Sequence, residues 1–167
     1  MYLKTRRTLF KQILFMLAFL LLPKRSSAVD VSPLTTIALV QGDLFPKRDG
    51  VPTLEQIDAA QYLKRVLQQK RVTQEHKDFI FNGVKWLDEE AVVLYKMSYS
   101  ALPSQERQNI LHAIAKESWG EKWIDTILTY IYEAMLSDPV YGGNKDGIGW
   151  KWLHHTPGLP RPEKALV

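Results

Sequence analysis

The stretch from Glu121 to Leu136 is apolar on almost every side of a helix, and Asp138-Pro139 ends it. A helix at the surface of a globular domain needs a single apolar stripe about 100° wide. A helix without a polar face must lie at the centre of a bundle or be covered on its second face by another protein. The large side chains concerned are Trp123, Ile124, Ile127, Leu128, Tyr130, Ile131, Tyr132, Met135 and Leu136.

Helix start signals precede this stretch at four places. Ser32-Pro33 can begin a helix, and Thr53 forms a capping box with Gln56. A third helix is predicted to start near Thr73, and a fourth after Leu102-Pro103, with Ser104 as its cap. No internal repeat and no convincing alternating pattern of a strand is present. The sequence therefore predicts an all-α fold, a small helical bundle.

Residues 90–102 are harder to assign. Ala91 to Tyr95 has the β-branched residues of a strand but no pairing partner, so we expect an irregular or helical stretch that crosses the core. The acidic run from Asp88 to Glu90 is typical of a solvated helix end. Gly83 weakens the third predicted helix locally and would allow another helix to approach closely.

The first 28 residues have the pattern of an export signal. Arg6-Arg7, followed by Leu9, Phe10 and Lys11, resembles the twin-arginine motif. The apolar run over residues 13–22 spans about 15 Å, too short for a hydrocarbon core of about 30 Å. Small residues before a cut between Ala28 and Val29 fit a cleavage site. We expect a periplasmic protein exported in the folded state; an ordinary secretory signal or an uncleaved anchor is the alternative.

Charge and cysteine content exclude several functions. Residues 1–28 hold six basic and no acidic residues, so the net charge falls from +4 for the whole chain to −2 for the remainder. A basic face for nucleic acid is therefore not expected. The absence of cysteine excludes a thiolate-held iron–sulfur cluster, a covalently attached c-type haem and a disulfide. We expect no catalytic residue, metal or cofactor in this chain.

The C-terminal part differs from the predicted bundle, which spans residues 29–137. Residues 138–167 are rich in Gly and Pro yet retain large aromatic side chains, as in an arm that packs on its own bundle or on a partner. A partner interface is predicted for this arm and the helix before it. Its candidate residues are Trp123, Tyr130, Tyr141, Gly142, Gly143, Asn144, Trp150 and Trp152.

The run from Asp138 to Trp150, DPVYGGNKDGIGW, closely resembles the signature of the gluconate 2-dehydrogenase subunit 3 family. The ending with Trp152, Pro157-Gly158 and Arg161-Pro162 is similar too, as is Leu44-Phe45-Pro46 upstream. The resemblance extends over nearly all of the chain after the signal.

This resemblance implies a non-catalytic small subunit of a membrane-associated dehydrogenase complex. In such complexes the large subunit is a flavoprotein of the glucose–methanol–choline oxidoreductase type that carries FAD, and a cytochrome c subunit carries haem c. The small subunit bears the twin-arginine signal, and the flavoprotein crosses the membrane with it through the twin-arginine translocase. The complex would hold the chain at the outer face of the cytoplasmic membrane. The substrate is a property of the large subunit.

Other interpretations have less support from the residues. A free-standing periplasmic binding module for a small ligand or protein is the main alternative. An enzyme subunit that contributes acid–base groups would use His112, His154 or His155. His154 and His155 are adjacent, so in an extended segment they point to opposite sides and are poorly placed for one metal ion. Gly142-Gly143-Asn144 lacks the spacing of a phosphate-binding loop.

Overall fold

The computed structural model describes residues 31–165 and confirms the all-α class. The predicted signal, including Arg6, Arg7 and the cleavage site at Ala28-Val29, lies outside the described residues. The described α-helices are α2 (Pro33–Leu44), α3 (Ala59–Gln68), α4 (Gln74–Tyr95), α5 (Ser104–Ile114), α6 (Ser118–Leu136) and α7 (Ile148–Trp152). Short 3-10 helices are η1 (Tyr99–Ala101), η2 (Pro139–Tyr141) and η3 (Lys145–Gly147). No strand occurs within residues 31–165.

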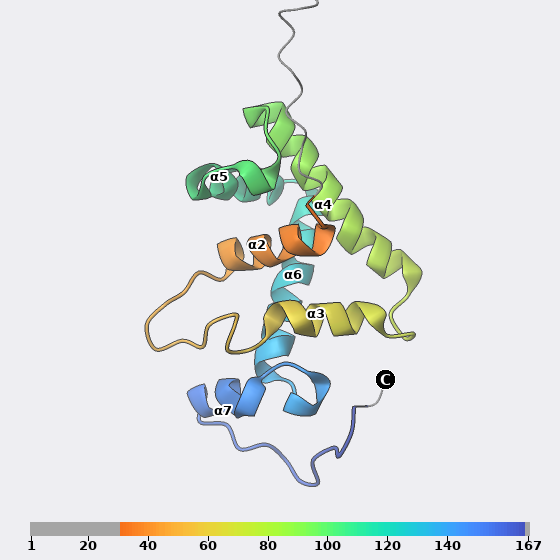
Figure 1. Ribbon diagram of the computed structural model, residues 1–167, viewed down its shortest axis with the longest axis vertical. Helices are drawn as coiled ribbons and strands as arrows, with labels where there is room; N and C mark the ends of the chain where they lie inside the picture. Colours follow the sequence, from red (N-terminus) through yellow and green to blue (C-terminus); the bar gives the residue numbers. More distant parts are fainter. Residues whose placement is uncertain (1–30, 166–167) are drawn as a thin grey trace, which may run out of the picture. The chain divides into compact units, whose positions relative to one another are not determined.

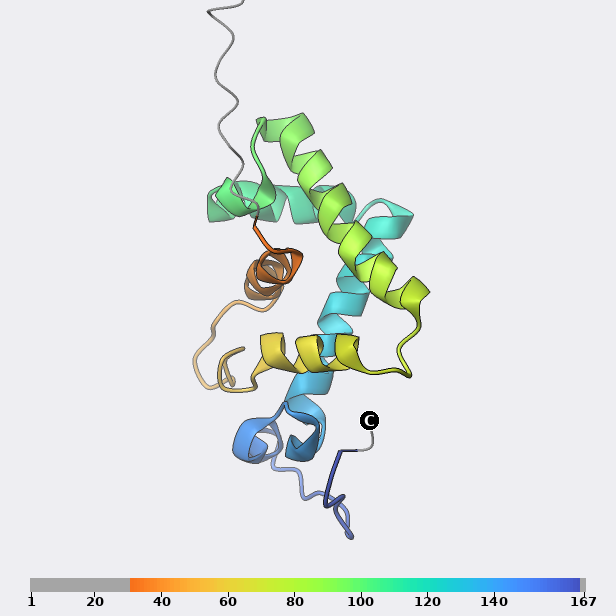
Figure 2. The ribbon, with the colours of Figure 1, turned by 45° about the vertical axis from the view of Figure 1, so that its right-hand side comes forward.

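Helix α6 is the central helix, which decides between the two possibilities for its apolar surface. It contacts α2, α3, α4, α5 and α7 (Figures 1 and 2). Trp123, Ile127 and Ile131 are fully buried. Among its large apolar side chains only Tyr132 and Leu136, at its C-terminal end, are exposed. Glu121, Lys122, Asp125, Thr129 and Glu133 form an exposed polar stripe along the helix. The bundle itself therefore covers the apolar side of the helix, and the prediction of a helix without a polar face is wrong.

The close approach expected at Gly83 is present between α4 and α6. The Trp123 indole lies against Gly83, and a Cβ atom built at Gly83 would be 2.0 Å from Trp123 Nε1. Trp123 Nε1 donates a hydrogen bond of 3.0 Å to the carbonyl oxygen of Ile80, in the turn of α4 before Gly83. The missing side chain of Gly83 thus creates the space for the largest buried residue.

The capping box forms, but the helix does not start there. The Thr53 amide donates to Gln56 Oε1 at 2.8 Å, and the Gln56 amide donates to Thr53 Oγ1 at 3.3 Å. Only a turn follows, because Asp58 adopts a left-handed conformation with φ of 56° and interrupts the helix. Helix α3 begins at Ala59, and the predicted start near Thr53 is wrong. The turn directs Ile57 into the core, where it is fully buried.

The prediction for residues 90–102 is also wrong in part. Helix α4 continues to Tyr95, so the acidic run lies within it rather than at its end. Asp88 Oδ1 accepts a hydrogen bond of 2.8 Å from the Tyr99 amide, which fixes the chain reversal after α4. The last turns do not cross the core, because Val92, Val93 and Leu94 are 48–64% exposed.

An ion pair joins the first described helix to α5. Arg107 donates through Nε to Asp43 Oδ2 at 2.7 Å and through Nη2 to Asp43 Oδ1 at 2.9 Å. The Tyr99 hydroxyl donates to the same Asp43 carboxylate at 2.7 Å. Helix α5 starts at Ser104 itself, after Pro103, and no side chain caps it, so the prediction of Ser104 as the cap is wrong.

Candidate functional site

Residues 138–153 form a folded unit at the C-terminal end of α6, which we call the C-terminal cap. It consists of η2, η3 and α7, and α7 packs on α6 (Figure 1). Asp138 Oδ1 accepts a hydrogen bond of 3.0 Å from the Val140 amide and so starts η2. The C-terminal cap therefore packs on its own bundle, despite a composition that favours flexibility.

Asn144 is the centre of the C-terminal cap and is fully buried. Its backbone amide donates to the carbonyl oxygen of Ala134, at the end of α6. Its side-chain Nδ2 donates to Ser137 O at 2.9 Å, and its Oδ1 accepts from the Gly149 amide at 2.8 Å. The last carbonyl groups of a helix lack partners within the helix, and Asn144 supplies two donors to them.

Two glycines of the cap bring its backbone against α6. A Cβ atom at Gly143 would lie 2.5 Å from the carbonyl oxygen of Ala134, and one at Gly149 would lie 2.0 Å from that of Met135. Both atoms belong to the backbone and cannot rotate away. The motif GGNxxxxG is therefore a packing motif, which joins the cap to the end of the central helix.

Trp150 fixes the remaining part of the chain. Its Nε1 donates to Leu136 O at 2.7 Å, and the guanidinium of Arg161 lies 5.1 Å from the centre of its ring. Arg161 also donates to both carboxylate oxygens of Asp138, at 2.9 and 3.0 Å. This hydrogen-bonded guanidinium lowers the pKa of Asp138. The end of the described chain is thus fastened to the C-terminal cap.

The structure corrects part of the predicted interface. Trp123 and Asn144 are fully buried, and Tyr130 is 8% exposed, so these side chains belong to the core of the chain. Gly143 is buried against α6. These residues cannot contact a partner in the described fold, and their assignment to the interface is wrong.

The other residues predicted for the partner interface are at least partly exposed to solvent. Gly142, Tyr141 and Trp150 are half-buried, and Trp152 is 40% exposed. Near Trp152 along the chain, Leu153 is 49% exposed. We refer to these two residues and to Tyr132 and Leu136, the exposed apolar side chains at the end of α6, together as the C-terminal surface.

A second exposed apolar cluster was not predicted. Val92, Val93, Leu94 and Met97 surround the end of α4, at the opposite end of this helix from α3. The signal in the sequence is the apolar run itself, and its assignment to the core is wrong. Consecutive helix residues point about 100° apart, so three of them in a row cannot all face one core.

The histidines considered for acid–base or metal chemistry do not form a cluster. His154 has a left-handed backbone conformation, and the His155 amide donates to Trp150 O at 2.8 Å. His112 lies on α5. Within residues 31–165, no group of three or more His, Cys, Asp or Glu residues could hold a metal ion.

Two partly buried hydrogen-bonded pairs join α3 and α4 to α6. The Tyr62 hydroxyl donates to Glu133 Oε2 at 3.1 Å, and His76 Nε2 lies 2.7 Å from the Tyr130 hydroxyl. Burial, and secondarily the Glu133 carboxylate, raises the pKa of Tyr62 to about 12. Burial and then Glu133 also raise the pKa of Tyr130.

The raised pKa of Tyr62 predicts a loss of stability in alkali. Unfolded tyrosine ionises near pH 10, whereas folded Tyr62 stays neutral up to about pH 12. The stabilisation is therefore complete below pH 10 and is lost as the pH rises from about 10 to 12. Tyr62→Phe should reduce this loss. Urea unfolding of both proteins at about pH 9 and pH 11 measures it, and an equal loss in both would contradict the assignment.

The described helices differ from membrane spans. None of those in residues 31–165 has both the length and the hydropathy that a crossing of the bilayer requires.

Comparison with known proteins identifies one family. The family model described as gluconate 2-dehydrogenase subunit 3 matches residues 34–158, from the first turn of α2 to the segment after α7. The C-terminal cap lies entirely within this match. No curated protein and no solved structure matches the chain.

Proposed function

Because this chain belongs to the gluconate 2-dehydrogenase subunit 3 family, we propose that it is the non-catalytic small subunit of a flavin-dependent dehydrogenase complex in the periplasm. The family match is the observation that carries this proposal. According to this proposal, the chain binds a large flavoprotein subunit of the glucose–methanol–choline type and takes it through the twin-arginine translocase. FAD belongs to that subunit, and haem c to a cytochrome c subunit.

The sequence of the leader supports the export part of the proposal. The twin-arginine route transports folded proteins, and a chain without cysteine supplies no thiolate for a cluster or haem that would require folding in the cytoplasm. A partner that acquires its flavin before transport accounts for this route. The partner then needs no signal of its own.

The C-terminal surface is the proposed contact for the flavoprotein. It combines two aromatic side chains, Tyr132 at 50% and Trp152 at 40% exposure, with Leu136 and Leu153. Tyrosine and tryptophan are enriched among the residues that dominate binding energy at interfaces. The cluster at the end of α4 is wholly aliphatic apart from Met97, so we place the main contact at the C-terminal surface.

Replacement of both signal arginines tests the export role. Arg6→Lys with Arg7→Lys should leave the small subunit and the flavoprotein in the cytoplasm, since this pair is the distinctive part of the motif. Lys24→Arg with Arg25→Lys keeps the charge and changes only positions outside the motif, so it should be exported normally. Immunoblots of periplasmic and cytoplasmic fractions measure both subunits. If the flavoprotein is still fully exported when both arginines are replaced, the small subunit does not carry it through the translocase.

The same assay separates docking from the signal. Trp152→Ser with Leu153→Ser leaves the signal intact, so the small subunit should reach the periplasm while the flavoprotein does so in much lower amounts. Val93→Ser with Leu94→Ser, at the end of α4, is the matched control for loss of exposed apolar surface. A stronger effect of the control pair would move the contact to the end of α4.

A further inference from the structure

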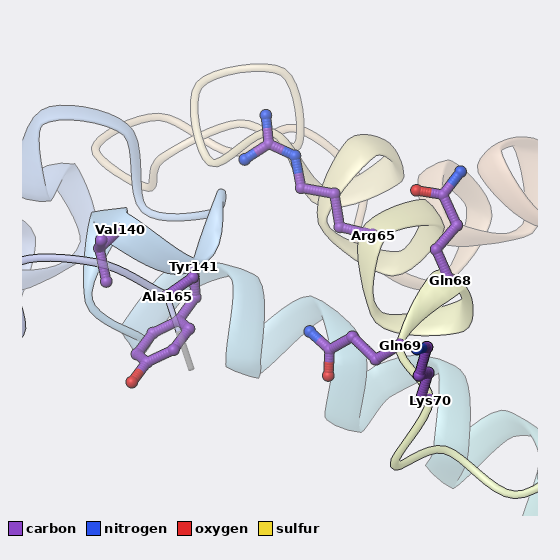
Figure 3. Close-up of a pocket in the computed structure, with 7 residues that line it drawn as sticks. All are labelled: Arg65, Gln68, Gln69, Lys70, Val140, Tyr141 and Ala165. Carbon is purple, nitrogen blue, oxygen red and sulfur yellow. The ribbon is translucent and has the colours of Figure 1, made fainter. Parts of the chain in front are cut away.

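A cavity of about 470 Å³ lies between the C-terminal end of α3 and the C-terminal cap. Figure 3 shows the two sides from which its side chains come. The α3 side supplies Arg65, Gln68, Gln69 and Lys70, and the opposite side supplies Val140, Tyr141 and Ala165. Cavities of this size accommodate small organic molecules.

The α3 side carries only positive charge. Arg65 and Lys70 line the cavity, and no Asp or Glu does. The two ion pairs found in residues 31–165 join Arg107 to Asp43 and Arg161 to Asp138, so neither cation of the cavity takes part in one. An anion in the cavity would therefore meet two cations that no carboxylate neutralises.

Gln69 adds a hydrogen-bond donor at the cavity. The residue is 8% exposed, and its Oε1 accepts a hydrogen bond of 2.6 Å from Arg71 Nε. Because an arginine nitrogen can only donate, this bond identifies the oxygen and leaves Nε2 as the free end. None of the hydrogen bonds found in the described part of the chain uses Gln69 Nε2. In Figure 3 this nitrogen lies on the side of the carboxamide toward Tyr141.

The cap side of the cavity is mostly apolar and also makes room for Arg65. Val140 and the Tyr141 ring belong to the cap, and Ala165, which follows the cap in the chain, completes this side. A Cβ atom at Gly142 would lie 1.9 Å from Arg65 Nη1, and Gly142 has a φ of 92° that other residues rarely adopt. The glycine therefore lets the guanidinium lie against the cap backbone.

We infer that this cavity binds a small organic carboxylate with a short apolar body. A carboxylate only accepts hydrogen bonds, which matches Gln69 Nε2, Arg65 and Lys70. Its apolar body would lie against Val140 and Tyr141. A sugar acid has the same charge but a hydroxylated body, which this apolar side would not satisfy. The inference does not rest on the proposed export or docking role.

A titration of the purified protein, followed by NMR, tests the inference with three probes. Hexanoate should shift the side-chain amide signals of Gln69 and the ring signals of Tyr141. Hexanol, which lacks the charge, should bind about tenfold or more weakly, because a hydrogen bond to a charged group contributes about that factor. Gluconate, which lacks the apolar body, should also bind more weakly than hexanoate.

Variants assign the binding to this cavity. Arg65→Gln with Lys70→Gln should weaken hexanoate binding about tenfold or more. Lys64→Gln changes an exposed lysine of the same helix that does not line the cavity, so it should leave the affinity unchanged. Circular dichroism checks that all variants are folded. Equal affinity for hexanol, unchanged binding in the double variant, or signals that shift only elsewhere would overturn the inference.

Discussion

Gly83→Ala should lower the free energy of unfolding by about 2 kcal/mol or more, despite the higher helix propensity of alanine. The added Cβ atom would lie 2.0 Å from Trp123 Nε1, and the ring is fully buried, so α4 and α6 must separate or the indole must move. Overpacking costs about 1–3 kcal/mol. Loss of the Trp123–Ile80 hydrogen bond would leave a buried donor unsatisfied at a further cost of about 1–3 kcal/mol. The higher helix propensity of alanine offsets only about 1 kcal/mol of this loss.

The matched control is the same substitution in another helix. Gly42 lies in α2, and a Cβ atom added there would have no neighbour within 4 Å, so Gly42→Ala should be neutral or stabilise by up to about 1 kcal/mol. Urea unfolding followed by tryptophan fluorescence measures both variants. If Gly83→Ala is as stable as Gly42→Ala, Trp123 does not pack against α4 as described.

Asn144→Ala should release the C-terminal cap and cost about 3 kcal/mol or more. It removes two buried side-chain hydrogen bonds, to Ser137 O and from the Gly149 amide, and each buried group left unsatisfied costs about 1–3 kcal/mol. It also puts alanine at a φ of 46°, where a Cβ atom costs about 1–2 kcal/mol. Limited proteolysis should then cut within residues 138–165 before it cuts the bundle.

Two further variants distinguish the causes of this effect. Asn144→Gly accepts the positive φ but lacks the side chain, so its stability should lie between those of Asn144→Ala and the unsubstituted chain. Asn109→Ala removes an exposed asparagine that donates to the Tyr95 hydroxyl at 3.2 Å, and should change stability little. Protection of the cap from protease in Asn144→Ala would show that the side chain of Asn144 is dispensable.

Local signals in the sequence predicted most helices and one packing contact. Pro33 and Thr73 mark helix starts because their effects act on the adjacent backbone: a fixed φ and a side-chain oxygen that accepts the His76 amide at 3.2 Å. The role of Gly83 was predictable because glycine destabilises a helix interior, so a glycine there often indicates close packing of a neighbour. The start of α3 was not, since the break depends on a left-handed residue, Asp58, that no pattern marks.

The candidate site was predicted less well. The family inferred from the run Asp138 to Trp150 is confirmed, and the family match covers this run. Its assignment to a partner interface failed for Gly143 and Asn144, because a motif that closes a helix end and one that binds a partner use the same residue types. Exposure separates the two, and exposure depends on contacts with residues distant in the sequence.

By itself the sequence determined the helical class and the family. It also showed the pattern of the leader and the apolar stretch Glu121–Leu136, for which a central position was one of two possibilities. Each of these depends on periodicity or on neighbouring residues, and so can be read along the chain. Only the tertiary structure decided that the apolar side of α6 is covered by its own bundle, that the cap closes its end, and that Arg65, Gln69 and Tyr141 line one cavity. These contacts join segments that are distant in the sequence, and their geometry follows from how side chains fill the space between helices.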